Sequence, residues 1–500
     1  MVNEKETSGG LELKANVIDG SSKISVPESG PIRSTWLGLA GLVLRLISKV
    51  RKFFEKAWSV GVDDPRKVIH CFKVGLALTV VSLFYYMRPL HQGLGGNAMW
   101  AVLTVVVVFE YTVGATLYKS LNRAAGTLLA GALAVGVHWF ASQSGETFEA
   151  IILRTSVFLL ASAATFSRFI PVVKARFDYG AMIFILTFSL VSVSAYRVDK
   201  LFDLAHQRFS TVAIGIFMCV LIGILICPVW AGQDLHLLIV RNMEKIANSL
   251  DGCVSEYYSS TVIDDDEEYS KKIKGYKCVL NSKGSEESLA NLARWEPPHG
   301  RFSFRHPWNQ YLKIGSLIRN CAYCIEALNG CIYSEIQAHE LIKKHLSSHC
   351  MRLSSNSSTV LKELAVITKT MKKSSTIDVS VAEMNSAVQD LQNALKMNFL
   401  PTQLIPSLLT SVEETRDLIL TMATTSVPVL LEVLPLVTVT SLLIEISARI
   451  GEIVYAVEEL ASMTGFTKPA GDENKNRQNK PVNSDDKGVV QETMKALQQV

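Results

Sequence analysis

The sequence predicts an all-α membrane protein in which six transmembrane helices precede a helical cytosolic domain. Three observations lead to this fold class: apolar residues are concentrated in the first half of the 500 residues, six apolar segments lie between residues 68 and 229, and Lys and Arg gather in alternate connections between them. We expect an N-terminal cytosolic segment at 1–67, a membrane domain at 68–230, a cytosolic domain at 231–467 and a disordered tail at 468–500.

The N-terminal segment contains a predicted basic amphipathic helix, TWLGLAGLVLRLISKVRKFFEKAW. Apolar residues such as Leu42, Leu46 and Phe53 fall on one side, with Lys and Arg interspersed. The cations follow the apolar run and no small-residue cleavage site comes after it, which is not the pattern of a cleavable signal peptide. Such a helix suits either an anionic membrane surface or a packing position on the cytosolic domain.

Six segments have the length and composition of membrane spans, which need about 20 mostly apolar residues. They are expected at 68–86, 97–113, 121–140, 151–169, 179–195 and 209–229. The third contains small residues at close intervals, AAGTLLAGALAVG, which predicts close pairing of helices. The cation-rich connections face the cytosol by the positive-inside rule, so both termini are expected there.

The second half predicts helices at 308–346, 358–373, 380–396, 406–425 and 435–463. Cys321 and Cys324 form a CxxC, but no second ligand pair follows at metal-site spacing, so we expect both to pack in a helical core. No nucleophile motif, phosphate loop or dinucleotide fingerprint occurs, which predicts a protein that is not an enzyme and has no cofactor. The net charge of +4 is too small, for this length, to indicate a nucleic-acid partner.

Charged residues inside the apolar segments are the first functional candidates, because charge at membrane depth is costly. Five of the six are positive; the set is Lys73, Glu110, Lys119, Arg123, Arg154 and Arg208. A single cation of this kind commonly reaches lipid phosphate from a helix end. Several cations without acidic neighbours in sequence favour an anion path, in which fixed ammonium and guanidinium groups replace the water that an anion sheds.

Glu110 is the one acidic residue within a predicted span. It is expected to form a structural ion pair with Lys73 or Arg123. The alternative is a group that responds to voltage or to protons.

Several stretches resemble a known family, the plant aluminium-activated malate transporters, which are anion channels. The matching stretches cover nearly the whole chain; they are DPRK, FKVGLAL, NAMWAVLTVVVVFEYTVGATLYKSLNRAAGTL, FDYG, PVWAGQDLH and WEPPHGRF. The resemblance implies a homodimer with six membrane helices per subunit and an anion path at the subunit interface.

The resemblance also implies roles for individual residues. It makes Arg123 and Arg208 the leading residues of the anion path and places Trp100 beside the path or in its gate. The charges within the apolar segments add Lys119 and Lys73 as candidates for the path and Glu110 as a residue beside it or in its gate. Three residues of the cytosolic domain form the family's WEP motif, a structural or regulatory joint, and these are Trp295, Glu296 and Pro297.

The function expected from these observations is a channel for malate and small inorganic anions such as chloride, nitrate and sulfate, gated by voltage and by the permeant anion. Its partners are a second copy of the chain, the anions and membrane lipid. The plasma membrane is the expected location and the vacuolar membrane is the alternative. A second interpretation is a proton-coupled exporter of organic acids, with Glu110 and His138 as the titratable groups; a third is a membrane-anchored scaffold.

Activation by aluminium is expected to be weak or absent. Al³⁺ requires several carboxylates, yet the first outer loop, MRPLHQGLGGN, contains none. The third outer loop offers Asp199 and Asp203, opposed by Arg197 and Lys200.

Overall fold

The computed structural model describes residues 31–86, 99–195, 201–258, 273–334, 340–399 and 417–467. These residues form helices and no β-strand, apart from two isolated bridges, so the all-α fold class is confirmed. The chain divides into two units, Met1–Val68 and Ile69–Val500. The predicted tail at 468–500 lies outside the described residues.

The first unit holds helix α1, Pro31–Asp63, and the start of α2, Pro65–Tyr86. Apolar side chains of α1 such as Leu46 and Phe53 are exposed. Asp64 caps the next helix, because its carboxylate accepts a hydrogen bond of 3.2 Å from the backbone N–H of Arg66. Pro65 then occupies the first helical position, where no N–H is needed.

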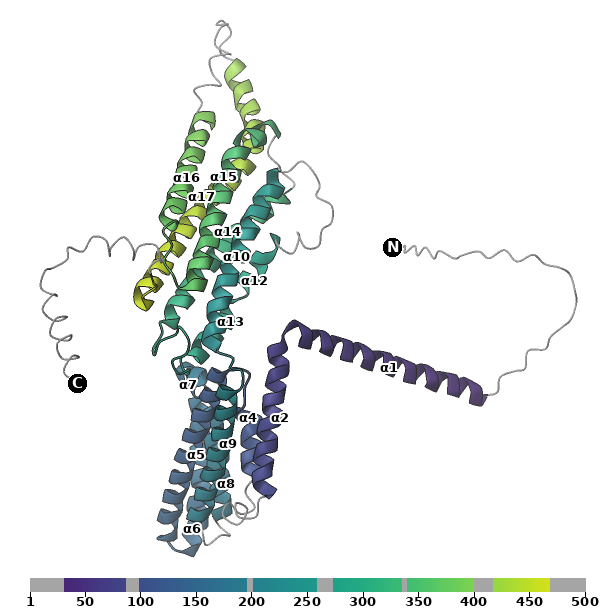
Figure 1. Ribbon diagram of the computed structural model, residues 1–500, viewed down its shortest axis with the longest axis vertical. Helices are drawn as coiled ribbons and strands as arrows, with labels where there is room; N and C mark the ends of the chain where they lie inside the picture. The colour runs from purple at the N-terminus through teal and green to yellow at the C-terminus, as the bar shows by residue number, and fades with distance from the viewer. Residues whose placement is uncertain are drawn as a thin grey trace, which may run out of the picture. The chain divides into compact units, whose positions relative to one another are not determined.

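The second unit begins with a group of helices that we call the first bundle (Figure 1). It consists of the rest of α2 with α4 (Met99–Val108), α5 (Val113–Ser142), α6 (Glu146–Ser167), α7 (Pro171–Arg176), α8 (Asp178–Ala195) and α9 (Leu201–Leu225). Helix α5 packs against α6, α8 and α9, while α4 packs against α9. One apolar cluster joins α2, α4 and α9, and a second joins α5 to α8.

Four helices in the described residues are long and apolar enough to cross a membrane. Three of these segments belong to the first bundle: Val113–Ser142, Phe148–Ser167 and Ala205–Leu225. Two more helices of that bundle, Met99–Val108 and Asp178–Val193, are apolar but shorter. The fourth candidate, Leu434–Thr464, lies elsewhere, in a helix whose residues Leu436, Ile446 and Ile453 are fully buried in a second core.

The boundary between the second and third predicted spans is wrong by eight residues, because α5 begins at Val113 rather than at 121. Thr112 caps the helix by accepting a hydrogen bond of 3.2 Å from the N–H of Ala115. The Thr116 hydroxyl adds bonds to both backbone groups of Glu110. Arg123 therefore lies ten residues into α5, about 15 Å along its axis, and not at its start.

The close helix pairing predicted from AAGTLLAGALAVG is confirmed at one glycine. A Cβ atom on Gly126 would stand 2.7 Å from the carbonyl oxygen of Gly180 in α8, so only glycine allows this approach. Ala130 and Ala134 continue the buried face of α5. Gly131 and Gly136 meet nothing within 4 Å and take no part in this contact.

The remaining helices form the second bundle (Figure 1), in the region where the sequence predicts a helical domain. They are α10 (Ala231–Tyr258), α12 (Gly275–Leu280), α13 (Lys283–Ala293), α14 (Trp308–Ile332), α15 (Glu340–Thr370), α16 (Ile377–Phe399) and α17 (Asp417–Thr464). Helix α10 packs on α15 and α14, α14 packs on α17, and α15 also packs on α16. Cys321 is buried in this core and Cys324 packs against it, as expected of apolar residues.

Three predicted helix boundaries in the second bundle differ from the structure. The helix expected at 308–346 ends at Ile332, and α15 starts at Glu340 rather than at 358. The polar run of α15 can be buried because Ser354 and Ser358 donate hydrogen bonds to Asp251 of α10. The two helices expected at 406–425 and 435–463 form one helix from Asp417 onward.

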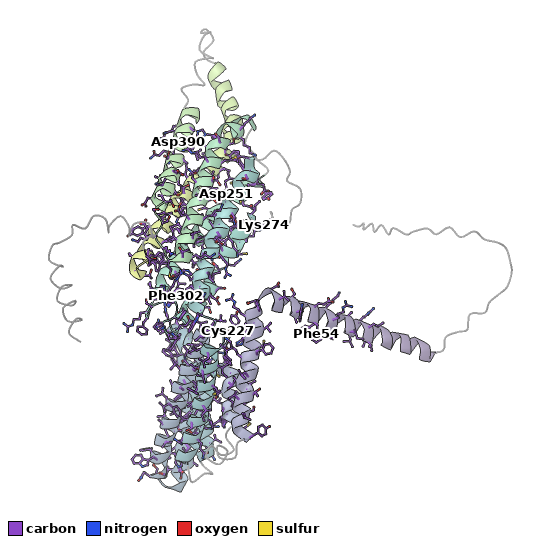
Figure 2. The ribbon with its side chains drawn as sticks, viewed as in Figure 1. Phe54, Cys227, Asp251, Lys274, Phe302 and Asp390 are labelled. Carbon is purple, nitrogen blue, oxygen red and sulfur yellow. The ribbon has the colours of Figure 1, made fainter. Side chains whose placement is uncertain are left out.

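An aromatic cluster fills the end of the second bundle that includes Phe302, which Figure 2 labels. Phe302, His306, Trp308 and Tyr311 contact one another with ring centroids 5.1–5.6 Å apart, except for the closer His306–Trp308 pair at 4.6 Å. Burial, together with the charges of His236 and His299, lowers the pKa of His306 to about 4. The cluster is therefore built around a neutral imidazole.

Acid should destabilise this cluster. In the unfolded chain His306 binds a proton below pH 6.5, whereas in the folded chain it stays neutral down to about pH 4. The free energy of unfolding is therefore highest above pH 6.5 and decreases as the pH falls from 6.5 to about 4. At pH 5 the loss is about 2 kcal/mol. We expect the melting temperature of H306Q to depend less on pH between 7 and 5 than that of the wild-type chain. The control is H349Q, because His349 lies in α15 and is half-buried outside the cluster. An equal pH dependence in H306Q and wild type would contradict this assignment.

Candidate functional site

Arg123 is the most buried cation of α5, with a relative exposure of 4 %. Its Nη1 donates a hydrogen bond of 3.2 Å to the hydroxyl of Tyr179 in α8. Its Nε is buried and has no hydrogen-bond partner among the described residues. A guanidinium always carries its charge and has five N–H donors, so this group holds an uncompensated positive charge and a donor available to a ligand.

Arg208 projects from α9 toward α4. The centre of its guanidinium lies 4.2 Å from the ring centroid of Trp100, which is a cation–π contact. Trp100 and Arg208, each expected at or near the anion path, thus come together from two helices that are about 100 residues apart in sequence. The ring covers the cation without neutralising it.

Arg123, Arg208 and Trp100 line one small cavity, where α4, α5, α8 and α9 meet. The cavity measures about 20 Å³, which is room for about one water molecule. The rest of its lining is Thr127, Ile183, Leu186, Thr187, Leu190 and Val212. Two cations, two hydroxyls and no carboxylate surround this space, so its chemistry suits an anionic group.

Lys119 lies one helical turn before Arg123 and forms an ion pair with Glu110. The partner expected for Glu110 was Lys73 or Arg123, and that expectation is wrong. The break between α4 and α5 places Glu110 beside the second turn of α5, where Lys119 is within reach. Lys119 also lies over the ring of Tyr179, 5.7 Å from its centroid. The acid therefore neutralises Lys119 and leaves Arg123 uncompensated.

Lys73 is buried but does not line the cavity. Its Nζ donates a hydrogen bond of 2.8 Å to the carbonyl oxygen of Cys227, just past the end of α9 and labelled in Figure 2. Cys227 has a φ of 40°, a left-handed conformation that ends a helix. The lysine thus satisfies an otherwise unpaired carbonyl at a helix C-terminus, where a positive charge is also favourable.

The carboxylate of Glu296, in the WEP motif, joins the two bundles. It accepts hydrogen bonds from the N–H groups of Ala231 (2.6 Å) and Gly232 (3.0 Å) at the start of α10. The N–H of Gly114, at the start of α5, also donates to it. Burial raises the pKa of Glu296, while these N–H groups and His299 oppose the rise. One acidic side chain therefore caps two helix N-termini, where negative charge is favourable.

Aromatic contacts surround this joint. The Trp295 ring meets Tyr118 of α5 edge to face at 5.7 Å, and His299 stacks on Trp230 at 3.8 Å. The Nδ1 of His299 donates to the carbonyl oxygen of Pro297 at 2.9 Å, which orients the imidazole. A Cβ on Gly114 would stand 2.5 Å from the carbonyl oxygen of Leu292, so glycine is required for the approach of α5 to the WEP segment.

Comparison with known proteins identifies the family of this chain. The family model described as aluminium activated malate transporter matches residues 58–407, which is more than half of the chain. The chain belongs to the aluminium-activated malate transporter family. The matched region runs from the end of α1 through the first bundle and most of the second.

Individual members of the aluminium-activated malate transporter family are similar over most of their length. Aluminum-activated malate transporter 10 of Arabidopsis thaliana is 52 % identical over 493 residues, which is 94 % of this chain and 98 % of that protein. Aluminum-activated malate transporter 2 of the same plant is 50 % identical over 380 residues, covering 75 % of this chain and 76 % of its own. Aluminum-activated malate transporter 1 of Triticum aestivum is 41 % identical over 454 residues, with coverages of 89 % and 93 %.

Some site residues of this family member were not singled out from the sequence. Tyr179 contacts both Arg123 and Lys119, and Thr127 and Thr187 supply hydroxyls to the cavity. Tyr179 stands in the FDYG stretch that carried the family resemblance, which was the available signal. The threonines gave none, because Thr occurs throughout the apolar segments and only the helix packing selects these two.

Removing the shared cap should loosen the joint of this transporter. We expect E296A to leave N–H donors of α5 and α10 unpaired and to cost roughly 1.5–3 kcal/mol, seen as a lower melting temperature of the full chain in detergent. The matched control is E287A, on the exposed side of α13. A melting temperature of E296A equal to that of E287A would show that the cap contributes nothing.

Proposed function

We propose that this chain forms an anion channel that conducts malate and small inorganic anions, including chloride, nitrate and sulfate. The observation that carries the proposal is the cavity that Arg123 and Arg208 both line. Among the described residues neither guanidinium has an acidic partner, and the buried Nε of Arg123 has no hydrogen-bond partner. The names of the relatives, malate transporters in each case, support malate as the organic anion.

The two arginines compensate an anion for the water that it loses inside the membrane. A carboxylate can accept two parallel hydrogen bonds from one guanidinium, which is stronger than a single neutral bond. Trp100 covers Arg208 in the present arrangement. An anion that competes for Arg208 displaces the ring, which gives the permeant anion a role in gating beside that of voltage.

The working assembly that we propose is a homodimer embedded in membrane lipid. Each subunit contributes six spans from 68–230, with both termini and the second bundle in the cytosol. The apolar residues exposed on the first bundle, such as Leu128, Leu129 and Phe217, are consistent with lipid or a second subunit as their neighbour. The plasma membrane is the proposed location, with the vacuolar membrane as the alternative, and the negative cell interior drives anions outward.

Two contacts of the first bundle favour a channel over a proton-coupled exporter. Glu110 is paired with Lys119 instead of facing the cavity. His138 lies 3.8 Å from Glu149 and is not part of the cavity lining. The two titratable groups on which a coupled carrier would depend are therefore held apart from the arginines.

Replacing either cavity arginine should reduce anion currents. We expect R123A and R208A to lower the apparent affinity for malate roughly 10- to 100-fold, because each loses a charge-assisted hydrogen bond of about 1.5–3 kcal/mol. Whole-cell patch clamp in a heterologous cell measures this effect, with surface labelling to match expression. R154A is the control, since Arg154 is exposed on α6.

Three outcomes would contradict the assignment of an anion channel with Arg123 and Arg208 in its path. Wild-type currents in both arginine variants would remove these residues from the path. Small fluxes that require a pH gradient would indicate the exporter, and a chain without any flux would indicate the scaffold.

Aluminium should have little effect on these currents. Residues 87–98 of the first outer loop and 196–200 of the third lie outside the described residues, so the expectation stands on the sequence, in which Asp199 and Asp203 are opposed by Arg197 and Lys200. We expect less than a twofold change in current when Al³⁺ is added outside the cell. A robust activation by micromolar-range Al³⁺ would contradict this.

A further inference from the structure

A second pocket lies at the joint between the bundles, apart from the cavity of Arg123 and Arg208. Its volume is about 380 Å³, which is within the range of small-molecule sites. Its polar and aromatic lining comes from α5, from the end of α7 and from α13 with the residues after it, and is Tyr118, Arg176, Ser288, Asn291, Arg294 and Trp295. We call it the joint pocket.

The charged side chains that line the joint pocket are positive. The two charged residues of its lining are both arginines, Arg176 and Arg294. The nearest acid along the chain from Arg176 is Asp178, whose carboxylate is held by two hydrogen bonds from Arg168, at 2.7 and 3.3 Å. Arg294 donates to a neutral partner, the side-chain oxygen of Asn309 at 2.6 Å, which leaves its charge in place.

Each arginine is positioned by its own bundle. The side-chain amide of Asn122 in α5 donates to the carbonyl oxygen of Arg176, which fixes the end of α7 on the first bundle. Ser288 and Asn291 are three residues apart on α13 and share one face, and Arg294 continues that spacing. The pocket therefore presents a guanidinium from the first bundle together with a guanidinium, a hydroxyl and an amide from the second.

We propose that the joint pocket binds a small dianion, either a dicarboxylate or a phosphate group, that bridges Arg176 and Arg294 and thereby regulates the coupling between the bundles. Arginine pairs carboxylate and phosphate through two parallel hydrogen bonds, and Ser288 and Asn291 supply further donors. The dianion comes either free from the cytosol or on the head group of an anionic lipid. Binding at this site does not depend on the function proposed above.

The position of the pocket gives the ligand a structural effect. Trp295 lines the pocket and is followed directly by Glu296, which caps α5 and α10. Tyr118 lines it as well and precedes Lys119, one turn before Arg123. A ligand that draws Arg176 and Arg294 together stabilises the arrangement in which the WEP segment contacts α5.

Binding to the full-length chain in nanodiscs of neutral phosphatidylcholine tests the free-anion source. The variant R123A is used as background, so that malate binding at the first cavity is weakened, and malate and inorganic phosphate are titrated by calorimetry. We expect R123A to bind at least one of the two probes, and R176Q or R294Q added to R123A to weaken that binding tenfold or more. K174Q is the matched control, because Lys174 is an exposed cation of α7 outside the pocket lining.

A second set of measurements keeps the test valid if R123A does not fold. It also tests an anionic lipid as the source of the dianion. In the wild-type chain, R294Q should remove one binding site from the stoichiometry of whichever probe, malate or inorganic phosphate, binds the joint pocket. In nanodiscs that contain a phosphoinositide, retention of that lipid through purification should fall tenfold or more in R176Q and R294Q but not in K174Q. Binding of malate, phosphate and lipid that is equal in all variants, or absent in the wild-type chain, overturns the proposal.

Electrophysiology separates this proposal from the assignment of the channel. We expect R294Q to shift the dependence of the current on the cytosolic probe anion that binds, while the single-channel conductance stays unchanged. R123A should instead change the conductance. A chain that binds the dianion at Arg176 and Arg294 yet carries no current would retain the joint pocket and refute the channel.

Discussion

The arrangement of the molecule depends on one buried carboxylate placed at two helix N-termini. Glu296 receives the N–H groups of Ala231 and Gly232 from α10 and that of Gly114 from α5. Each helix start leaves unpaired donors and a partial positive charge, and a shared anion satisfies both. The start of α5 is thereby fixed against the second bundle. This contact also fixes the positions of Lys119 and Arg123 along the axis of the first bundle.

Four of the buried and half-buried cations of the first bundle divide into two pairs with different surroundings. Lys73 is bound to a carbonyl oxygen at the end of α9, and Lys119 is bound to Glu110. These two stabilise the bundle. Arg123 and Arg208 have no acidic partner within the described residues and share a cavity. The uncompensated charge is therefore located at the site where four helices meet, which is the electrostatic basis of an anion site.

Helix α5 connects the cavity to the joint through neighbouring faces. Lys119 and Arg123 are four residues apart and both contact Tyr179 of α8. Tyr118 and Asn122, each one position earlier, contact Trp295 and the end of α7 instead. Gly126 then allows α8 to approach closely. Because one helix carries both faces, the coupling that we propose between the joint and the cavity needs no intermediate loop.

The sequence alone determined the helical class and singled out Arg123 and Arg208, because hydropathy and charge at helical spacing are local properties. It also pointed to the WEP motif, although only by resemblance. It did not determine that α5 starts at Val113, that Glu110 pairs with Lys119, or that Lys73 binds a carbonyl. Those outcomes depend on which backbone and side-chain groups remain unpaired after the helices pack. Only the tertiary structure decides this, through the hydrogen bonds of Thr112, Cys227 and Glu296.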